Sequence, residues 1–160
     1  MTNTLPEWRW CGHTIASHSD LPENVTDFVY LITFTSGHKY IGKKTVRAMR
    51  RLPPKKAQLA LRKNFVRREL VNVPFLKYQG STEHALGLEV ASRTILYLCS
   101  TKKSATYLET ALLFRTDAVL RNDYVNRNIS GRFFADDLDG IVDSDTSSWA
   151  VIDTWKCVNV

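Results

Sequence analysis

The sequence is short of cysteine, and it has neither a long apolar run nor an internal repeat. The three cysteines at positions 11, 99 and 157 are odd in number and far apart. They therefore predict neither a disulfide framework nor a zinc cage, and a reducing cytoplasm is the simplest setting. The absence of a run of about eighteen apolar residues excludes a membrane-spanning helix. Residues 1–20 lack the charged and apolar segments of a secretory signal.

What is present indicates one soluble globular domain. The chain has 160 residues, of which 44% are hydrophobic, enough for a single core. We expect three parts: an irregular N-terminal arm over residues 1–26, a main domain over 27–133, and an acidic extension over 134–160 that packs on the same domain. Trp8 and Trp10 predict a short strand that anchors the arm.

The charge is unevenly distributed. The net charge is +6, yet residues 38–77 hold thirteen Lys or Arg and a single acid, Glu69. Residues 136–145 hold five Asp and no base. A dense block of one sign is typical of a surface that binds a polyanion, usually nucleic acid. A solvated helix face that only keeps the protein soluble is the alternative.

Hydrophobic periodicity predicts three strands, two helices and one further edge strand. Residues 28–33 and 39–43 read as strands of a hairpin that turns at Gly37. Residues 93–99 are apolar on both faces and predict a central strand. Residues 55–70 predict a helix whose charge is almost entirely positive. A second helix is expected from Ser104, its N-cap, to about Leu113. Residues 149–160 alternate weakly and predict an edge strand.

Two short motifs in the hairpin resemble the motif pair of the GIY-YIG nucleases. Residues 40–42 read Tyr-Ile-Gly, and residues 28–30 read Phe-Val-Tyr, which keeps the tyrosine but replaces the usual Gly and Ile. A basic segment, a Tyr-x-Gly-Ser loop at 78–81, a helix with Glu109 and a segment with Asn126 follow in the family's order. The resemblance implies an α+β fold, a small three-stranded antiparallel sheet flanked by helices.

The tyrosine pair suggests how a water molecule is oriented. Tyr30 and Tyr40 fall on adjacent antiparallel strands, so their hydroxyls can converge. A free tyrosine has a pKa near 10 and is a poor base at neutral pH, but flanking cations favour the phenolate. We expect Lys43, Lys44 and Arg47 to lower that pKa. Tyr30 is then the candidate general base or water-orienting residue and Tyr40 its positioning partner; two ordinary sheet tyrosines are the alternative.

The resemblance also implies a phosphate clamp and a metal ligand. Arg47 and Arg50 are the candidates for the clamp, because a guanidinium presents two donors to a phosphate. Glu109 is the candidate ligand of a single Mg²⁺ or Mn²⁺ ion, which keeps much of its hydration. Its helix places it above Leu112 and Leu113, facing the body. A salt bridge to a nearby Lys or Arg, or a capping contact, is the alternative. The expected catalytic set is Tyr30, Tyr40, Lys44, Arg47, Arg50, Glu109 and Asn126.

Double-stranded DNA is the expected partner, and no contact with a membrane is expected. The expected location is the cytoplasm, which for a phage-encoded enzyme is the cytoplasm of the host. Phosphate contacts are expected from residues that do not read sequence, namely Lys43, Arg51, Lys55, Lys56, Arg62, Lys63, Arg67, Arg68, Lys77, Tyr78 and Ser81. The leading hypothesis is a metal-dependent endonuclease. The rivals are an inactive nucleic-acid-binding protein of the same fold and a module whose basic face binds an acidic protein.

Overall fold

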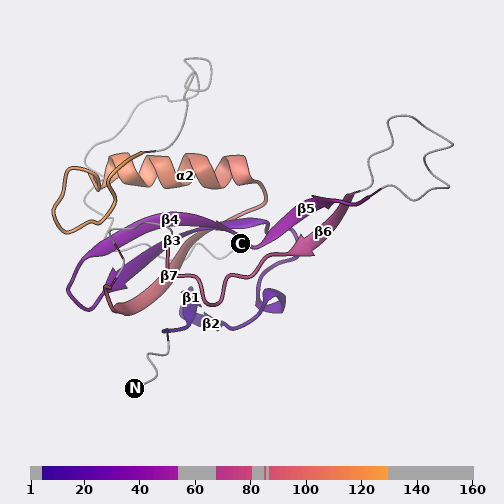
Figure 1. Ribbon diagram of the computed structural model, residues 1–160, viewed down its shortest axis with the longest axis horizontal. Helices are drawn as coiled ribbons and strands as arrows, with labels where there is room; N and C mark the ends of the chain where they lie inside the picture. The colour runs from indigo at the N-terminus through magenta and orange to yellow at the C-terminus, as the bar shows by residue number, and fades with distance from the viewer. Residues whose placement is uncertain (1–4, 54–67, 81–84, 86, 130–160) are drawn as a thin grey trace, which may run out of the picture.

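Two separate β-sheets and one α-helix make up the described part of the chain. The computed structural model describes residues 5–53, 68–80, 85 and 87–129. Five strands form one sheet in the order β2-β1-β7-β3-β4, and two form a second sheet (Figure 1). The elements are β1 (Trp8–Trp10), β2 (His13–Ile15), the short 3-10 helix η1 (His18–Asp20), β3 (Asp27–Phe34), β4 (Lys39–Thr45), β5 (Arg47–Arg51), β6 (Arg68–Asn72), β7 (Val90–Cys99) and α2 (Lys102–Arg115).

The predicted fold class, a small three-stranded antiparallel sheet flanked by helices, was wrong. Strands at 28–33, 39–43 and 93–99 are present, and β3 pairs antiparallel with both β4 and β7. The free edge of β7, however, pairs in parallel with β1, and β1 in turn pairs with β2. The sheet is therefore mixed. An unpaired edge of a central strand leaves backbone donors and acceptors unsatisfied, and the N-terminal segment supplies partners for them.

The main sheet has a hydrophobic core on each face. Alternate residues of β3 point to opposite faces, so Phe28, Tyr30 and Ile32 join Trp8 and Phe75 in one core. The residues between them face α2, whose Leu112 and Leu113 pack with Val29 and Ile41 in the other core. In Figure 1, α2 covers one face of the sheet, and β1 and β2 lie towards the other. Within the described residues, α2 is the only α-helix.

Helix α2 begins earlier than the sequence predicted. Thr101, not Ser104, is the N-cap: its side-chain oxygen accepts a hydrogen bond from the Ser104 backbone N–H. The helix then runs to Arg115, and Thr116 follows as its C-cap. Thr101 and Ser104 are both suitable N-cap residues for this helix. Because β7 ends at Cys99, the helix can begin directly after Thr101.

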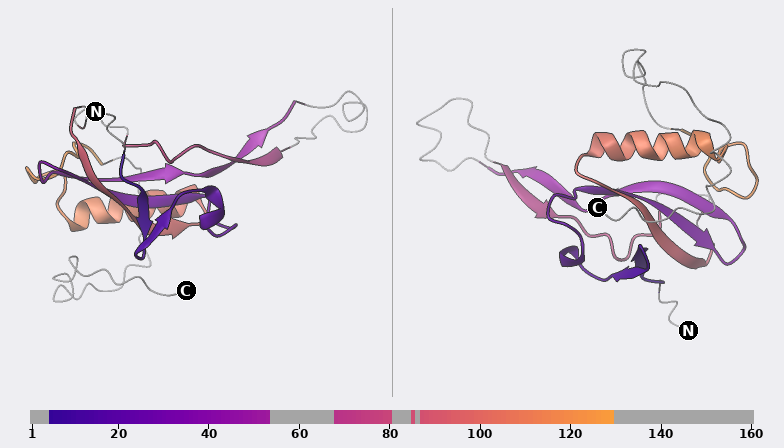
Figure 2. Two further views of the ribbon diagram at one scale, coloured as in Figure 1. Left: turned by 90° about the horizontal axis from the view of Figure 1, so that it is seen from below. Right: turned by 180° about the vertical axis from the view of Figure 1, so that it is seen from behind.

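Strands β5 and β6 form a two-stranded ribbon that extends beyond the main sheet (Figure 2). Residues 68–70, expected at the end of a helix, lie in β6, so that part of the helix prediction was wrong. The register pairs Arg47 with Asn72 and Arg51 with Arg68. The remainder of the expected helix lies outside the described residues, as do residues 130–160 with the acidic extension and the expected edge strand.

One cysteine differs from expectation. Cys11 is disulfide-bonded, which the sequence did not predict, whereas Cys99 is a free, buried thiol. No helix within the described ranges is long and apolar enough to cross a bilayer.

Candidate active site

Gly42 lets the side chain of Tyr30 cross strand β4. The register places Gly42 directly opposite Tyr30, and β4 lies at the edge of the sheet. A Cβ atom at position 42 would lie 2.5 Å from the Tyr30 hydroxyl oxygen and 2.7 Å from its ring carbon Cζ. Any side chain here would collide with the phenol. The glycine of the Tyr-Ile-Gly motif thus gives the Tyr30 hydroxyl its place above the edge strand.

Three tyrosines gather around this glycine; we call Tyr30, Tyr40 and Tyr78 the tyrosine cluster. The ring centroid of Tyr30 lies 6.0 Å from that of Tyr40 and 5.9 Å from that of Tyr78. The Tyr30 hydroxyl donates a 3.4 Å hydrogen bond to the Tyr78 hydroxyl. Gly80 also lies against Tyr40, since a Cβ atom there would be 3.0 Å from its ring. The two hairpin tyrosines thus lie in the same core, and a third tyrosine from the 75–80 loop packs with them.

The cluster keeps the Tyr30 phenol neutral. Tyr30 is fully buried, and burial raises its pKa well above 10, with further increases from Tyr40, Tyr78 and the Glu109 carboxylate. The expected lowering by Lys and Arg is not observed, because the desolvation of a phenolate dominates. Tyr30 therefore has the properties of a neutral hydrogen-bonding residue rather than of a phenolate base.

The loop that carries Tyr78 is held by residues far away in sequence. The Trp8 indole N–H donates to the Phe75 carbonyl at 3.1 Å. The buried Arg93 guanidinium donates to the Leu76 carbonyl at 2.6 Å and to the Tyr78 carbonyl at 3.0 Å. Arg93 also stacks on the Trp8 ring at 4.7 Å. Arg93 was missed from the sequence, although a lone charge in an otherwise apolar strand signals a buried partner.

Two consecutive lysines of β4 point to opposite faces of the sheet. Lys44 lies on the tyrosine face, with its ammonium 4.4 Å from the centre of the Tyr78 ring. Lys43 lies on the helix face and donates a hydrogen bond to Oε2 of Glu109. The Glu109 side chain is only 15% exposed, as expected for a carboxylate facing the body. The ion pair that was an alternative for Glu109 is therefore present.

Asn126 binds the backbone of the edge strand. Its Nδ2 donates to the Ile41 carbonyl at 2.8 Å, and its Oδ1 accepts from the Ile41 N–H at 3.0 Å. On the same edge, Lys39 exchanges backbone hydrogen bonds with Asp123 and Val125. With both ends of its amide engaged, Asn126 is placed to position the motif strand rather than to contact a substrate.

Arg47 is buried and faces backbone carbonyls. Its guanidinium donates to the carbonyls of Pro22 at 2.6 Å, Val25 at 2.7 Å and His18 at 2.7 Å, with a longer bond to Leu21 at 3.2 Å. A guanidinium has five N–H donors, so these bonds leave little to offer a phosphate. The structure gives Arg47 a role in fixing the 18–25 segment, and does not present it as a clamp.

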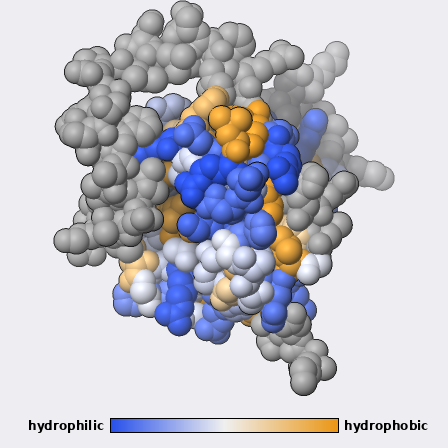
Figure 3. All heavy atoms as spheres, turned by 90° about the vertical axis from the view of Figure 1, so that its left-hand side faces the viewer, coloured by the Kyte–Doolittle hydropathy of each residue, from blue (hydrophilic) through white to orange (hydrophobic). Residues whose placement is uncertain are grey.

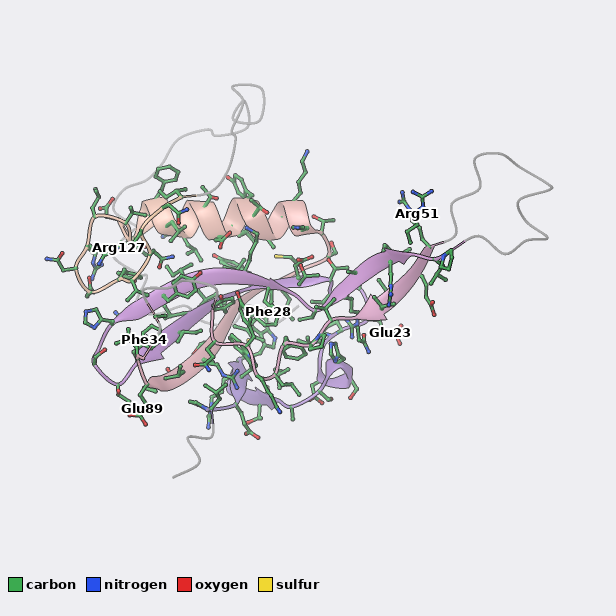
Figure 4. All side chains as sticks on the ribbon, in the orientation of Figure 1. Glu23, Phe28, Phe34, Arg51, Glu89 and Arg127 are labelled. Atoms are coloured by element: carbon green, nitrogen blue, oxygen red, sulfur yellow. The ribbon has the colours of Figure 1, made fainter. Side chains whose placement is uncertain are left out.

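The other predicted basic residues divide into two groups. Arg50, Arg51 and Arg68 lie exposed on the ribbon, away from the tyrosine cluster, and Figure 4 shows Arg51 near its far end. Lys77 is exposed next to Tyr78. The remaining predicted DNA-contacting residues lie outside the described residues: Lys55, Lys56, Arg62, Lys63, Arg67 and Ser81.

The donor set around Glu109 fits a hydrated divalent ion. In the described part of the chain, no three His, Cys, Asp or Glu side chains come together. An ion here would take one protein carboxylate and complete its shell with water and phosphate oxygens, an arrangement that suits Mg²⁺. Glu109 is slightly exposed, which allows access, but Lys43 must release the carboxylate oxygen that it holds.

Comparison with known proteins agrees with this geometry. A family model described as "Putative endonuclease segE, GIY-YIG domain" matches residues 8–129. The match begins at β1 and extends beyond Asn126, so it includes the tyrosine cluster and Glu109. No match was found among curated proteins or among solved structures.

Proposed function

We infer the function of this chain from its family, because it belongs to the GIY-YIG nuclease family of the SegE type. Endonuclease activity characterises the family. We propose that this protein is a metal-dependent endonuclease that hydrolyses phosphodiester bonds of double-stranded DNA with one Mg²⁺ or Mn²⁺ ion. One observation carries the proposal: two different functional groups lie at neighbouring positions of the edge strand β4. The buried Tyr30 hydroxyl lies above Gly42, and the Glu109 carboxylate pairs with Lys43 on the opposite face.

Glu109 is the residue that would hold the ion. A divalent ion bound there would supply a water of lowered pKa and polarise the scissile phosphate. Lys43, which pairs with Glu109 in the absence of the ion, would be released to a position beside the substrate, where its ammonium can meet phosphate charge. Lys43 compensates the charge of the partly buried Glu109 carboxylate, and an ion held there would take over that role.

The tyrosine cluster would orient rather than deprotonate the nucleophile. The Tyr30 phenol remains neutral at physiological pH, as its raised pKa requires. A neutral phenol both donates and accepts one hydrogen bond, which is sufficient to align a water. Tyr30 and Tyr40 are both buried, so they would act by positioning Tyr78, the partly exposed member of the cluster. Lys44 lies over Tyr78 and adds positive charge on the same side.

A plasmid assay tests the proposal. Purified protein incubated with supercoiled plasmid and Mg²⁺ or Mn²⁺ should produce relaxed or linear DNA on a gel, and EDTA should stop the reaction. The Glu109→Gln variant serves as the matched control for a contaminating nuclease. Binding without cleavage across several DNA substrates and both metals would instead support the inactive DNA-binding rival, which the burial of Arg47 favours.

A further inference from the structure

The β5–β6 ribbon is an arm with two different faces. Its five residue pairs run from Arg47–Asn72 to Arg51–Arg68. Within the described residues its strands pair only with each other. Figures 1 and 2 show it projecting away from the main sheet and from α2. Because side chains alternate between faces, the pairs Met49–Leu70 and Arg51–Arg68 share one face, and Arg50–Glu69 occupies the other.

The face with Met49 and Leu70 is unfavourable for an isolated ribbon. Met49 is 58% exposed and its cross-strand partner Leu70 is 50% exposed. Two residues further out, Arg51 and Arg68 lie directly opposite each other, and like charges in that position destabilise a strand pair. On the other face, Arg50 is opposite Glu69, which balances the charge. The uncompensated face therefore indicates a partner that offers both negative charge and apolar surface.

Exposed apolar residues elsewhere lack this combination. Phe114 and Leu120 are also exposed, and they belong to the helix end and the loop after it. Figure 3 shows the end of the molecule opposite the ribbon as mostly hydrophilic, with small apolar patches. The ribbon differs by its arginine pair and by its connecting sequence, since residues 52–67 contain five Lys or Arg and no acid. Charge complementarity thus selects a polyanion.

We propose that the ribbon lies in the major groove of duplex DNA, with Met49 and Leu70 against thymine methyl groups and with Arg51 and Arg68 on the flanking phosphates. The proposal rests on DNA being the substrate. The major groove is about 12 Å wide and admits a two-stranded ribbon, and the thymine methyl is its apolar feature. The site at β4 would then cut one part of the duplex while the ribbon binds another part of the same duplex.

Replacing thymine by uracil tests the apolar contact without altering the protein. Binding of fluorescent duplexes, identical except for T or U, is measured by anisotropy in EDTA so that nothing is cut. The wild type should bind the uracil duplex about fourfold more weakly for each methyl contacted. The Met49→Ser/Leu70→Ser variant should not distinguish the duplexes. Equal affinity of the wild type for both duplexes would overturn the apolar contact.

Salt dependence tests the arginine pair. Arg51→Gln/Arg68→Gln should reduce the slope of log affinity against log salt by about 1.8, since each phosphate contact contributes about 0.9. The control Arg9→Gln/Arg127→Gln removes the same charge from exposed sites off the ribbon, and Figure 4 shows Arg127 at the end opposite Arg51. It should leave the slope unchanged. An equal loss of slope in both variants would overturn the placement of the arginines.

Heparin separates groove binding from general polyanion binding. The serine variant should bind heparin as tightly as the wild type does, because heparin has no bases, whereas the arginine variant should bind it more weakly. Weaker heparin binding by the serine variant would show that Met49 and Leu70 support binding to any polyanion, and it would overturn their assignment to the bases. These measurements need no cleavage, so failure of the nuclease proposal in the plasmid assay remains a separate result.

Discussion

The two faces of strand β4 carry different functional groups at the adjacent positions 42 and 43. On one face, Gly42 accommodates the buried, neutral phenol of Tyr30, and the Lys44 ammonium lies over the neighbouring Tyr78 ring. On the other face, Lys43 and Glu109 form a partly exposed ion pair. The difference suggests that the two faces have different roles: the helix face would hold the metal ion, and the tyrosine face would orient the nucleophile. Substitutions that affect one face should therefore leave the role of the other intact.

Removing the charge of Glu109 should have the largest effect. Glu109→Gln keeps the size of the side chain but removes the carboxylate that would hold the ion. Loss of several kcal/mol of transition-state stabilisation corresponds to a rate decrease of about 1,000-fold or more. DNA affinity should stay the same or increase through reduced repulsion. Plasmid cleavage and anisotropy measure the two quantities. Glu89→Gln removes an exposed carboxylate elsewhere and should cleave normally; normal cleavage by Glu109→Gln would refute the assignment.

Loss of the Tyr30 hydroxyl should have a smaller effect, about 10-fold, because it removes one hydrogen bond without removing charge. Tyr30→Phe deletes the bond to Tyr78 but keeps the ring packing against Trp8 and Tyr40. Single-turnover cleavage at saturating protein measures the rate, and DNA affinity should be unchanged. Tyr107→Phe, on an exposed tyrosine of α2, is the control. A Tyr30→Phe enzyme as fast as that control would reduce Tyr30 to a packing residue.

Alkaline pH should reveal the buried phenol. The pKa of Tyr30 is raised in the folded state. Below pH 10, the folded and unfolded states therefore both keep the phenol proton, and the free energy of unfolding does not depend on this group. Above pH 10 the unfolded chain releases the proton first, and stability falls by up to about 1.4 kcal/mol per pH unit. Urea unfolding of the wild type at pH 8 to 11 should show this fall, and Tyr30→Phe should show a shallower one. Identical slopes would mean that the phenol titrates normally.

Lys43→Gln should have the smallest effect, measured on metal binding in the absence of DNA. Without the ammonium, the Glu109 carboxylate is free, and Mn²⁺ affinity should rise about threefold, a modest factor because the pair is partly exposed. Calorimetric titration of Mn²⁺ without DNA measures it. The neighbouring substitution Lys44→Gln, on the tyrosine face, should leave Mn²⁺ affinity unchanged. A decrease for Lys43→Gln, or equal changes for both, would contradict the division between the faces.

Sequence periodicity located the parts of the site that depend on local structure. The hairpin strands, the adjacent tyrosines and the inward face of Glu109 follow from alternation along a strand or from helical spacing. Periodicity says nothing about contacts between distant segments. Arg47 therefore looked like a phosphate ligand, although the 18–25 segment surrounds it with carbonyls. Likewise, only the tertiary structure shows that Trp8 and Arg93 hold the loop of Tyr78.

The Asn126 amide has the same donor and acceptor arrangement as a peptide group, and it binds Ile41 as a neighbouring strand would. An exposed edge strand is a template for pairing with other chains. With the backbone hydrogen bonds at Lys39, this single side chain blocks the start of β4 against such pairing. The strand can then carry its motif at the edge of the sheet without recruiting a second molecule. Asn126 thus occupies the pairing positions of Ile41 that a strand from another molecule would otherwise need.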